Sequence, residues 1–589
     1  MKHNRTSIPR LRLIPEIWKY QAFTKCLLVL LLALIRTAAL FLLRMTGRVA
    51  VSSGDYRFLF RTWQGVLILI LFVAVLFFYV SLDLNVKILY AGNVLNGVKE
   101  PVRATVKRAL RALPKFLNPD GVGVTLYVAL IAPLVGAGLN ISLTKDLKVP
   151  SFISSVIAAT PLYSTLYAVL ITVFAVIGVA HIFCLHGVLL DGLSIRTARW
   201  YSRELMSKHW KHFLLWNTRY ALFMFALVTL EIVLFFFAPL TLAGTLFAGV
   251  SDVTAIRFLT IVTLLSGSVL TGVVSSLVTP FYIVRITVLY RQYSKGVQIT
   301  VPPRPGHVSR NPVPFLGLVC IAVFATVSLS SLMAQNFDTY FPRDTKTKII
   351  AHRGGGNEAP ENTVAGLKTA IALGSFGSEI DIQRTADGYY IVNHDANFQR
   401  VAKDSRTPAE MTLSQVRRLR VQDSDSRVAT LEEMLDAAKG HLLLFIELKG
   451  DTADTQMCDD VVKIIKKRDM LNEAVVISMK YDLIDYIETW YPEVLSGYLT
   501  YFGYGDFAKL NCDFLGVEEQ SATPSLIDAT HAQGRQVLVW TPNTLDAQEY
   551  FLTSNADAII TDNVVQANKI VNRLNERNDF ERILSAFRW

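Results

Sequence analysis

Seven long apolar stretches before residue 340 constrain this chain more than any other feature of its sequence. A bilayer core of about 30 Å is crossed by about 20 apolar residues in a helix, and each stretch meets or approaches that length. The stretches lie near residues 24–43, 64–82, 122–143, 163–189, 213–239, 257–284 and 314–334. A single soluble domain is therefore excluded, and residues 1–340 are predicted to form an all-α domain that crosses the lipid bilayer.

The charge of the chain changes sign at the end of these stretches. Residues 1–344 contain 33 Lys and Arg against 12 Asp and Glu, whereas the remaining residues contain 26 against 36. The basic residues gather in short loops between apolar stretches, which is typical of membrane topology and does not indicate a nucleic-acid partner.

The basic loops also predict an orientation, because short positive loops stay in the cytoplasm. The N-terminal segment and the second, fourth and sixth loops are basic and are predicted to be cytoplasmic. Seven spans then place the C-terminal domain outside the cytoplasm. The first loop disagrees, since it carries Arg44, Arg48, Arg57 and Arg61, and one span more or fewer would reverse the orientation.

The second loop contains a further pattern. Val102, Val106, Leu110 and Leu113 recur at helical spacing between basic residues, which predicts a basic amphipathic helix. Such a helix lies on a membrane surface or serves as an ordinary connector.

Residues 345–589 have a different pattern, in which short β-branched runs alternate with helix-like segments. The segments are 348–351, 364–373, 378–383, 389–393, 431–438, 442–448, 475–478, 536–540 and 558–561. Strand and helix in turn predict a parallel α/β fold. The length is close to that of a (β/α)8 TIM barrel, whose active site lies at the carboxyl ends of the strands. A doubly wound open sheet is the alternative.

Acidic residues occupy two of the predicted strands. Glu379 and Asp381 flank Ile380, and residues two apart on a strand project to the same side; Glu447 and Lys449 repeat this spacing around Leu448. Three carboxylates in one barrel mouth would repel one another without a cation. Ligation by oxygen alone favours a hard ion, so we predict one divalent cation, Ca²⁺ or Mg²⁺.

Two histidines, His352 and His394, each follow a predicted strand. A pair of imidazoles can divide the roles of general base and general acid near neutral pH. Arg353 can offer a planar fork to a phosphate, and Lys449 adds a point charge beside the cation. Together these groups predict a site for an anionic phosphodiester.

The order of the motifs resembles that of glycerophosphodiester phosphodiesterases. The matching segments are His-Arg-Gly at 352–354, Pro-Glu-Asn-Thr at 360–363, Glu-x-Asp at 379–381, Asp-Gly at 387–388, His-Asp at 394–395, Thr-Leu-Glu-Glu at 430–433, Ile-Glu-Leu-Lys at 446–449, Trp-Thr-Pro-Asn at 540–543 and Ile-Thr-Asp at 560–562. The multi-span region resembles the membrane domain that precedes this catalytic domain in some bacterial members.

The resemblance implies a role for each matching residue. Glu379, Asp381 and Glu447 would bind the metal, His352 and His394 would carry out acid–base catalysis, and Arg353 and Lys449 would hold the phosphate. Glu361 and Asn362 would support the site, and Trp540 would pack against the glycerol or the leaving group, unless it is a core residue. The implied reaction is attack of a glycerol hydroxyl on phosphorus, giving a cyclic phosphate that water then opens to glycerol 3-phosphate.

Two other functions remain open at this point. The enzyme would act on intact lipid or on a glycerophosphate polymer as a lysophospholipase D or a cyclising phospholipase. Alternatively, the membrane domain would transport or scramble lipid, either beside the enzyme activity or in its place.

Overall fold

A computed structural model describes residues 14–128 apart from 53–55, 97 and 99, residues 151–234, 252–295 and 313–342, and residues 345–587 apart from 502. The chain forms two compact units. The first is helical and comprises Met1–Thr37, Leu69–Val149 and Ile153–Phe337. The second contains the β-sheet and comprises Ala38–Ile68, Pro150–Phe152 and Asp338–Trp589.

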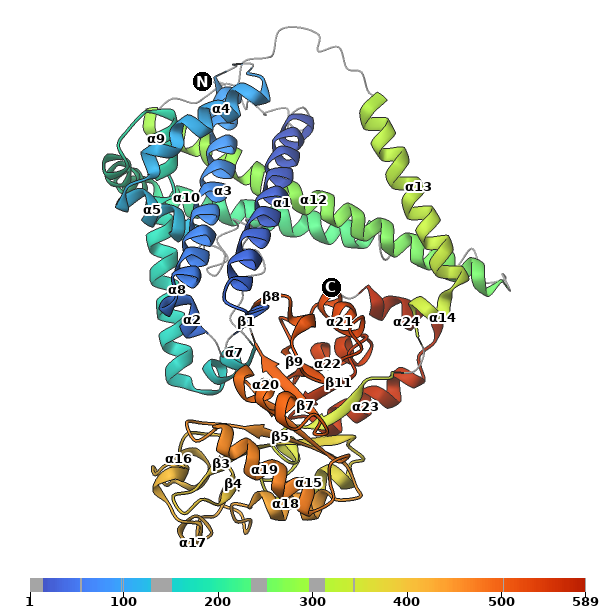
Figure 1. Cartoon of the computed structure of the whole chain (residues 1–589). Coiled ribbons are helices and arrows are strands. Elements are labelled where there is room, and N and C mark those ends of the chain that lie inside the picture. Colours follow the sequence, from blue (N-terminus) through green and yellow to red (C-terminus); the bar gives the residue numbers. More distant parts are fainter. Residues whose placement is uncertain are drawn as a thin grey trace. The chain divides into compact units, whose positions relative to one another are not determined.

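Long apolar helices make up most of the N-terminal half (Figure 1). They are α1 (Ile14–Arg44), α3 (Trp63–Leu95), α8 (Pro161–His181), α10 (Ile195–Ile232), α12 (Val253–Lys295) and α13 (Val313–Gln335), with the shorter helices α2 (Tyr56–Arg61), α4 (Val102–Ala112), η3 (Leu113–Phe116), α5 (Pro119–Leu126), α7 (Ser151–Ala159) and α9 (Cys184–Leu190) between them. Many of their large apolar side chains face outward, such as Leu166, Phe225 and Phe324. This is the opposite of a water-soluble surface and suits a lipid environment.

Five described helices are long and apolar enough to cross a membrane: Lys19–Arg44, Trp63–Leu95, Pro161–Leu190, Ile195–Ile232 and Val253–Ser294. They coincide with the first, second, fourth, fifth and sixth predicted spans. The seventh predicted span corresponds to α13, whose apolar part Val319–Gln335 is shorter. Most of the third predicted span lies outside the described residues, so the predicted number of seven stays a prediction.

The helix predicted in the second loop is present as α4, but a different face of it is buried. Thr105, Val106, Ala109 and Ala112 are buried, whereas Leu110 is exposed. Val106 and Ala109 belong to the same apolar cluster as Tyr20 and Leu82 of the helical unit. Small side chains allow this close packing, and α4 is therefore a packed connector within its unit.

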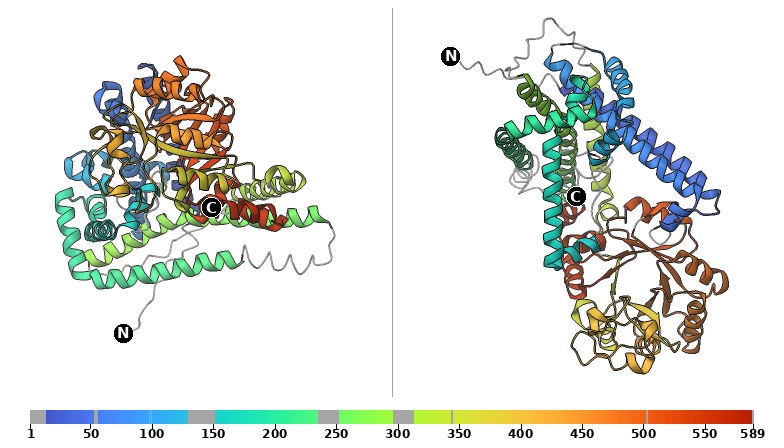
Figure 2. Two further views of the ribbon diagram at one scale, coloured as in Figure 1. Left: turned by 90° about the horizontal axis from the view of Figure 1, so that it is seen from below. Right: turned by 90° about the vertical axis from the view of Figure 1, so that its left-hand side faces the viewer.

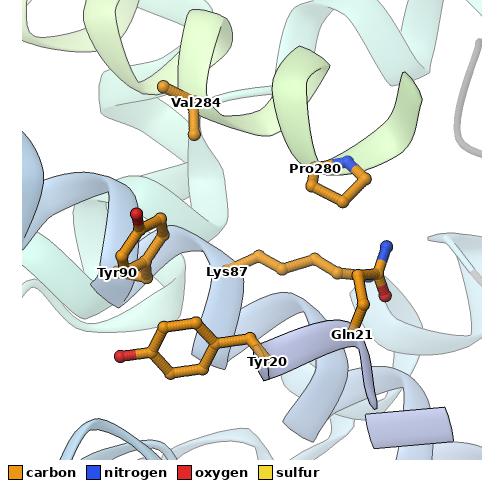
Figure 3. Close-up of a pocket in the computed structure, with 6 residues that line it drawn as sticks. All are labelled: Tyr20, Gln21, Lys87, Tyr90, Pro280 and Val284. Atoms are coloured by element: carbon orange, nitrogen blue, oxygen red, sulfur yellow. The ribbon is translucent and has the colours of Figure 1, made fainter. Parts of the chain in front are cut away.

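A buried ion pair lies at the end of the apolar part of α3. The Lys87 ammonium is 2.5 Å from the Asp83 carboxylate, and both side chains are buried. Lys87 also borders a cavity of about 10 Å³ (Figure 3), whose other walls are Tyr20, Gln21, Tyr90, Pro280 and Val284. A space of this size holds about one water molecule.

The second unit is built on a closed parallel barrel (Figures 1 and 2). Its eight strands are β2 (Lys348–Ala351), β3 (Gly377–Arg384), β5 (Leu443–Leu448), β6 (Ala474–Ser478), β7 (Ser496–Thr500), β9 (Phe514–Glu518), β10 (Gln536–Trp540) and β11 (Ala558–Thr561). The strands pair in this order, and the β2–β3 pairing closes the ring. The predicted TIM barrel is therefore confirmed, and the open doubly wound sheet is excluded.

Helices follow most of the strands and cover the outside of the barrel. They are α15 (Val364–Ala372), α18 (Leu431–Ala438), α19 (Thr455–Lys467), α20 (Tyr481–Trp490), α21 (Pro524–His531), α22 (Leu545–Leu552) and α23 (Val564–Asn575), with α14 (Phe337–Tyr340) before the barrel and α24 (Asp579–Ala586) at the end. One apolar cluster joins the strands to these helices. A second cluster fills the barrel interior, with Ile350, Phe445 and Leu538 among its members, so the barrel is a packed core.

The segment predicted as a strand at 389–393 is not part of the barrel ring. It forms β4 (Tyr390–Val392), which pairs with β3 in the antiparallel direction. A tight turn at Asp387-Gly388 brings the chain back along β3, and Gly388 there has a φ of +86°, a conformation that glycine adopts without strain. An excursion with α16 (Gln399–Ala402), η7 (Pro408–Glu410) and α17 (Leu413–Val416) then precedes α18.

Candidate active site and metal centre

Three carboxylates meet at the carboxyl ends of two neighbouring strands. Glu379 and Asp381 lie on β3, and Glu447 lies on β5 in direct register with Asp381. Each contributes one oxygen to a group in which all oxygens lie within 4.8 Å of one another. All three residues are buried. The structure therefore brings together the three acidic residues that the sequence analysis singled out.

Lys449 is the nearest positive charge to this cluster. Its ammonium nitrogen donates to Asp381 at 2.8 Å and to Glu447 at 2.9 Å. One ammonium faces three carboxylates, so the cluster keeps an excess of negative charge if all three are ionised. Burying unpaired charge is costly, and a divalent cation would supply the missing balance.

The protonation of the cluster reflects this excess. Burial and then the neighbouring Asp381 raise the pKa of Glu379, and burial raises the pKa of Glu447 as well. Burial also acts to raise the pKa of Asp381, but the adjacent Lys449 ammonium outweighs it, and the net shift is downward. The Oε1 atom of Glu379 is buried without a hydrogen-bond partner. An orphaned carboxylate oxygen beside two others is a donor set that fits a hard divalent cation.

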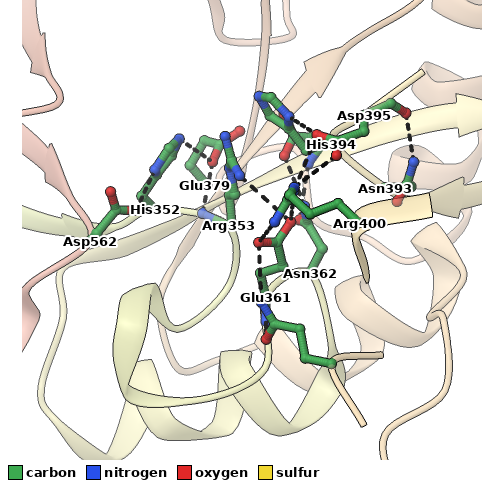
Figure 4. Close-up of polar contacts among 12 residues, drawn as sticks. His352, Arg353, Glu361, Asn362, Glu379, Asn393, His394, Asp395, Arg400 and Asp562 are labelled. Carbon is green, nitrogen blue, oxygen red and sulfur yellow. Dashed lines mark hydrogen bonds and ion pairs between the residues drawn. The ribbon is translucent and has the colours of Figure 1, made fainter. Parts of the chain in front are cut away.

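His352 follows β2 and is held by Asp562, which directly follows the last strand of the barrel, β11 (Figure 4). Its Nδ1 lies 2.6 Å from Asp562 Oδ1, and its Nε2 lies 3.8 Å from Glu379 Oε2. Burial acts to lower the pKa of His352, but the Asp562 carboxylate outweighs it, and the net shift is upward. Asn543 donates to the other oxygen of Asp562 at 2.5 Å. The imidazole is therefore fixed by one nitrogen, with the other turned toward the carboxylate cluster.

His394 reaches the site by a different route from the one expected. It was predicted to stand at the exit of a barrel strand, but it follows the antiparallel strand β4. Because β4 runs back along β3, Asn393 beside it bonds to the backbone of Asp381 at 2.9 Å. His394 Nδ1 lies 2.8 Å from Asp395 Oδ1. This hydrogen bond is the first cause that holds the pKa of Asp395 well below its usual range. The two histidines are thus each anchored by an aspartate.

A chain of ion pairs links His394 to Arg353 (Figure 4). Arg400 donates to Asp395 at 2.8 Å and binds Glu361 with two nitrogens, at 2.6 and 2.7 Å. Glu361 in turn lies 3.6 Å from the Arg353 guanidinium. The Nε atom of Arg353 is buried with no hydrogen-bond partner, so this fork has capacity for an anion.

Asn362 contacts the cluster directly. Its side-chain amide donates to Asp381 Oδ2 at 2.8 Å, and its backbone has a φ of +56°. Asparagine tolerates this left-handed conformation better than most residues. The Arg353 backbone N–H, also at a positive φ, donates to Glu379 Oε2 at 2.9 Å. Both predicted supporting residues, Glu361 and Asn362, therefore lie in the polar network. Asn362 contacts the carboxylate cluster itself, whereas Glu361 contacts two arginines, Arg353 and Arg400.

Trp540 is less closely connected with the site. It ends β10 and packs against the apolar cluster inside the barrel, where Ile350 and Leu538 lie. It lies at the carboxyl end of its strand, near the mouth of the barrel, and is only partly buried. Contact with a glycerol or a leaving group stays a prediction.

Four residues of the site had no role predicted from the sequence: Asp562, Asp395, Asn543 and Arg400. Asp562 follows β11 directly, and residues that follow strands of such a barrel are the usual reactive ones, so this signal was available. Asp395 stood next to a histidine already chosen. Asn543 ended the matching Trp-Thr-Pro-Asn segment at 540–543, so it too carried a signal. Arg400 carried none, because only the folded chain brings it to these carboxylates.

Two families match the two halves of the sequence. Residues 352–566 match the family described as "Glycerophosphoryl diester phosphodiesterase family". Residues 14–328, more than half of the chain, match "Membrane domain of glycerophosphoryl diester phosphodiesterase".

Individual proteins of this kind are also similar to the chain. Glycerophosphodiester phosphodiesterase 1 of Mus musculus is 26% identical over 276 residues, which cover 38% of this chain and 80% of that protein. A glycerophosphodiester phosphodiesterase of Caldanaerobacter subterraneus is 26% identical over 229 residues, covering 37% and 94%. The crystal structure of a glycerophosphodiester phosphodiesterase from Parabacteroides distasonis is 24% identical and covers 39% of this chain and 98% of its own, with a TM-score of 0.36. The chain belongs to the glycerophosphoryl diester phosphodiesterase family and carries the membrane domain of that family ahead of its phosphodiesterase barrel.

Proposed function

We propose that this protein hydrolyses glycerophosphodiesters to glycerol 3-phosphate and an alcohol, with residues 345–589 as the catalytic domain and residues 1–340 as its membrane domain. The observation that carries the proposal is the carboxylate cluster of Glu379, Asp381 and Glu447. His352 Nε2 lies 3.8 Å from Glu379, and Asn393, the neighbour of His394, donates its N–H to the Asp381 carbonyl at 2.9 Å. The named relatives support the substrate class.

The two histidines would exchange protons with the substrate in two steps. In the first, one imidazole takes the proton of a glycerol hydroxyl as that oxygen bonds to phosphorus. The P–O bond to the alcohol breaks, and the other imidazole protonates the departing oxygen. In the second, water adds to phosphorus, the ring P–O bond breaks, and both histidines regain their starting protonation. Asp562 and Asp395 would keep each ring in one orientation throughout.

Charge on the phosphate would be met by the two basic residues that line the cluster. Arg353 offers a guanidinium with a free buried N–H, and Lys449 offers an ammonium that already touches two carboxylates. A divalent cation bound by Glu379, Asp381 and Glu447, either Ca²⁺ or Mg²⁺, would stabilise charge on the phosphoryl oxygens and orient the hydroxyl.

The membrane domain would hold the barrel at the lipid bilayer, outside the cytoplasm. Substrates there are deacylated headgroups, lipids or glycerophosphate polymers.

The direct test is a substrate panel with the purified full-length protein in lipid, with and without Ca²⁺ or Mg²⁺. We expect metal-dependent release of glycerol 3-phosphate from glycerophosphodiesters. Product masses separate the alternatives, because a cyclising phospholipase leaves a cyclic phosphate and a lysophospholipase D releases lysophosphatidate. Absence of glycerol 3-phosphate with every ion would contradict the proposal.

Two variants complete this test. His352→Ala should lose turnover by about 100- to 10,000-fold, the usual contribution of acid–base catalysis. His441→Ala is the matched control, because His441 is exposed and outside the site, and it should remain fully active. A cell phenotype that persists in His352→Ala would point to transport by the membrane domain instead.

A further inference from the structure

The linker between α1 and α3 belongs to the barrel unit and not to the helical unit. Residues 38–68 group with the barrel, although they connect the first two membrane-spanning helices. The linker contains a short strand, β1 (Ala50–Ser52), and the barrel contains a matching one, β8 (Gly503–Gly505).

The two strands form an antiparallel pair in a defined register. Ala50 faces Gly505, and Ser52 faces Gly503. The Asp506 N–H extends the ladder by donating to the Val49 carbonyl at 3.0 Å. A side chain at Gly505 would not fit, since its Cβ would lie 2.5 Å from Ala50 Cα and 2.6 Å from the Val49 oxygen. The glycine in β8 therefore lets the backbone of β1 approach closely.

Apolar packing adds to the hydrogen bonds on both faces of β1. Ala50 is buried in the main barrel cluster, which also contains Phe507 and Leu510 from the segment after β8. On the opposite face, Val51 is buried with Leu43 and Phe58 of the linker's own flanks. Alternate residues of β1 therefore face two different apolar clusters, which fixes the register.

The position of β8 places this contact at the catalytic end of the barrel. β8 begins three residues after β7 ends at Thr500, and the loops after the strands form the mouth of a TIM barrel. In the ring order, β7 lies four strands from β2, which leads to His352. The linker is thus held at the rim across the mouth from His352.

We propose that the linker is a fixed part of the catalytic rim, and that linker and barrel therefore lie on the same side of the membrane. This inference holds whatever substrate the enzyme uses. It also bears on the four arginines of the linker, which by charge alone would indicate the cytoplasmic side. The pairing and burial of β1 determine the side of the membrane on which this loop lies more strongly than the charge of the loop does.

Cross-linking tests the register. Val51 and Tyr504 are Cα partners, within the usual reach of a disulfide. In full-length protein with the exposed Cys26 and Cys320 replaced by serine, Val51→Cys with Tyr504→Cys should form a cross-link that mass spectrometry assigns. The control pair, Val51→Cys with Trp490→Cys, should not, because Trp490 ends α20 at the far end of the barrel. No cross-link in the first pair, or equal yields in both, would overturn the proposal.

A glycine variant tests the close approach. Gly505→Ala should release the linker, so that trypsin cleaves after Arg57 at least about tenfold faster, since local opening controls such cleavage. Gly534→Ala is the matched control, because Gly534 also has a positive φ but nothing lies near its Cβ. Equal cleavage rates in the two variants would contradict the proposal.

Labelling tests the shared side. Cysteine replaces Arg57 in the linker or Tyr389 on the barrel, both of which are exposed. In sealed vesicles of one orientation, a membrane-impermeant maleimide should label both positions or neither. Labelling of only one would overturn the proposal. None of these measurements depends on activity, so their failure is distinct from failure of the proposed function.

Discussion

Of the three clustered carboxylates, Glu379 has the environment that best fits a bound cation. Its pKa is raised, one of its oxygens has no hydrogen-bond partner, and the other accepts the Arg353 N–H. Asp381, in contrast, already has partners in Lys449 and Asn362. A cation would therefore change the protonation of Glu379 more than that of Asp381.

The metal site and the acid–base site can be separated by mutation. Glu379→Ala or Glu447→Ala should lose bound metal and activity together, because each removes one of three ligands. His394→Ala should keep the metal and lose turnover by about 100- to 10,000-fold, because it removes a proton carrier only. Metal analysis of purified protein beside kcat checks this, and metal loss in the His394 variant would argue for a ligand role.

The Asp562 carboxylate should set the pH dependence of His352. It raises the pKa of His352, so the ring keeps its proton to higher pH than an ordinary histidine. In Asp562→Asn the proton is lost at lower pH. The limb of the kcat/KM profile that belongs to His352 should therefore move to lower pH, and kcat should fall by about 10- to 100-fold. An unchanged profile with reduced kcat would mean that Asp562 serves structure alone.

At the scale of elements, several of the barrel helices, among them α15, α18 and α19, begin with a side-chain cap. Thr430 starts α18 by accepting the Glu433 N–H at 3.2 Å, and the Glu433 carboxylate accepts the Thr430 N–H at 3.0 Å. Arg417 then binds that carboxylate with two nitrogens, each at 2.6 Å. This capping box ties the excursion after β4 to the helix that precedes β5.

Removal of this cap should destabilise the barrel measurably. Thr430→Ala should cost about 1 kcal/mol, which corresponds to about 2–4 °C in the Tm of a domain of this size. Thr369→Ala is the control, since Thr369 is half-buried within α15 and its hydroxyl donates to the Ala365 carbonyl without capping the helix. Thermal unfolding of the two variants in the same detergent makes the comparison; equal Tm values would mean that the cap contributes nothing.

Two barrel strands, β7 and β9, were not identified from the sequence. Each has a glycine where a strand usually has a β-branched residue, Gly497 and Gly516. The folded barrel gives the reason: a Cβ at Gly497 would lie 2.9 Å from Ile477, and one at Gly516 would lie 2.3 Å from Leu499. The glycines make room for large neighbours on adjacent strands, which a single strand's pattern does not reveal.

At the scale of the whole molecule, the predicted orientation in the membrane depends on the predicted odd number of spans. Tags at the two ends of the chain test it. In intact cells, a protease added outside should remove a C-terminal tag and leave an N-terminal tag protected, because the basic N-terminal segment stays in the cytoplasm. Both tags should be cleaved after permeabilisation. Protection of the C-terminal tag in intact cells would place the barrel inside.

The sequence by itself determined the class of each half and predicted the residues to which the chemistry is assigned. Apolar length identified spans because a bilayer admits few other backbones, and the alternation of strands and helices identified a parallel barrel. The spacing of Glu379 and Asp381 put two carboxylates on one side of a strand, since side chains alternate along any strand. Each of these inferences depends only on residues that lie close together in the sequence, so no knowledge of the tertiary structure is needed for it.

Tertiary structure alone decided which groups meet across the chain. The register of β3 with β5 sets Asp381 beside Glu447, and the antiparallel return of β4 carries His394 to them. Closure of the barrel brings Asp562 to His352 across 210 residues, and β1 reaches β8 from outside the barrel sequence altogether. Pairings of this kind depend on the global arrangement of strands, because the free energy that selects them comes from packing between distant segments and is not contained in any one of them.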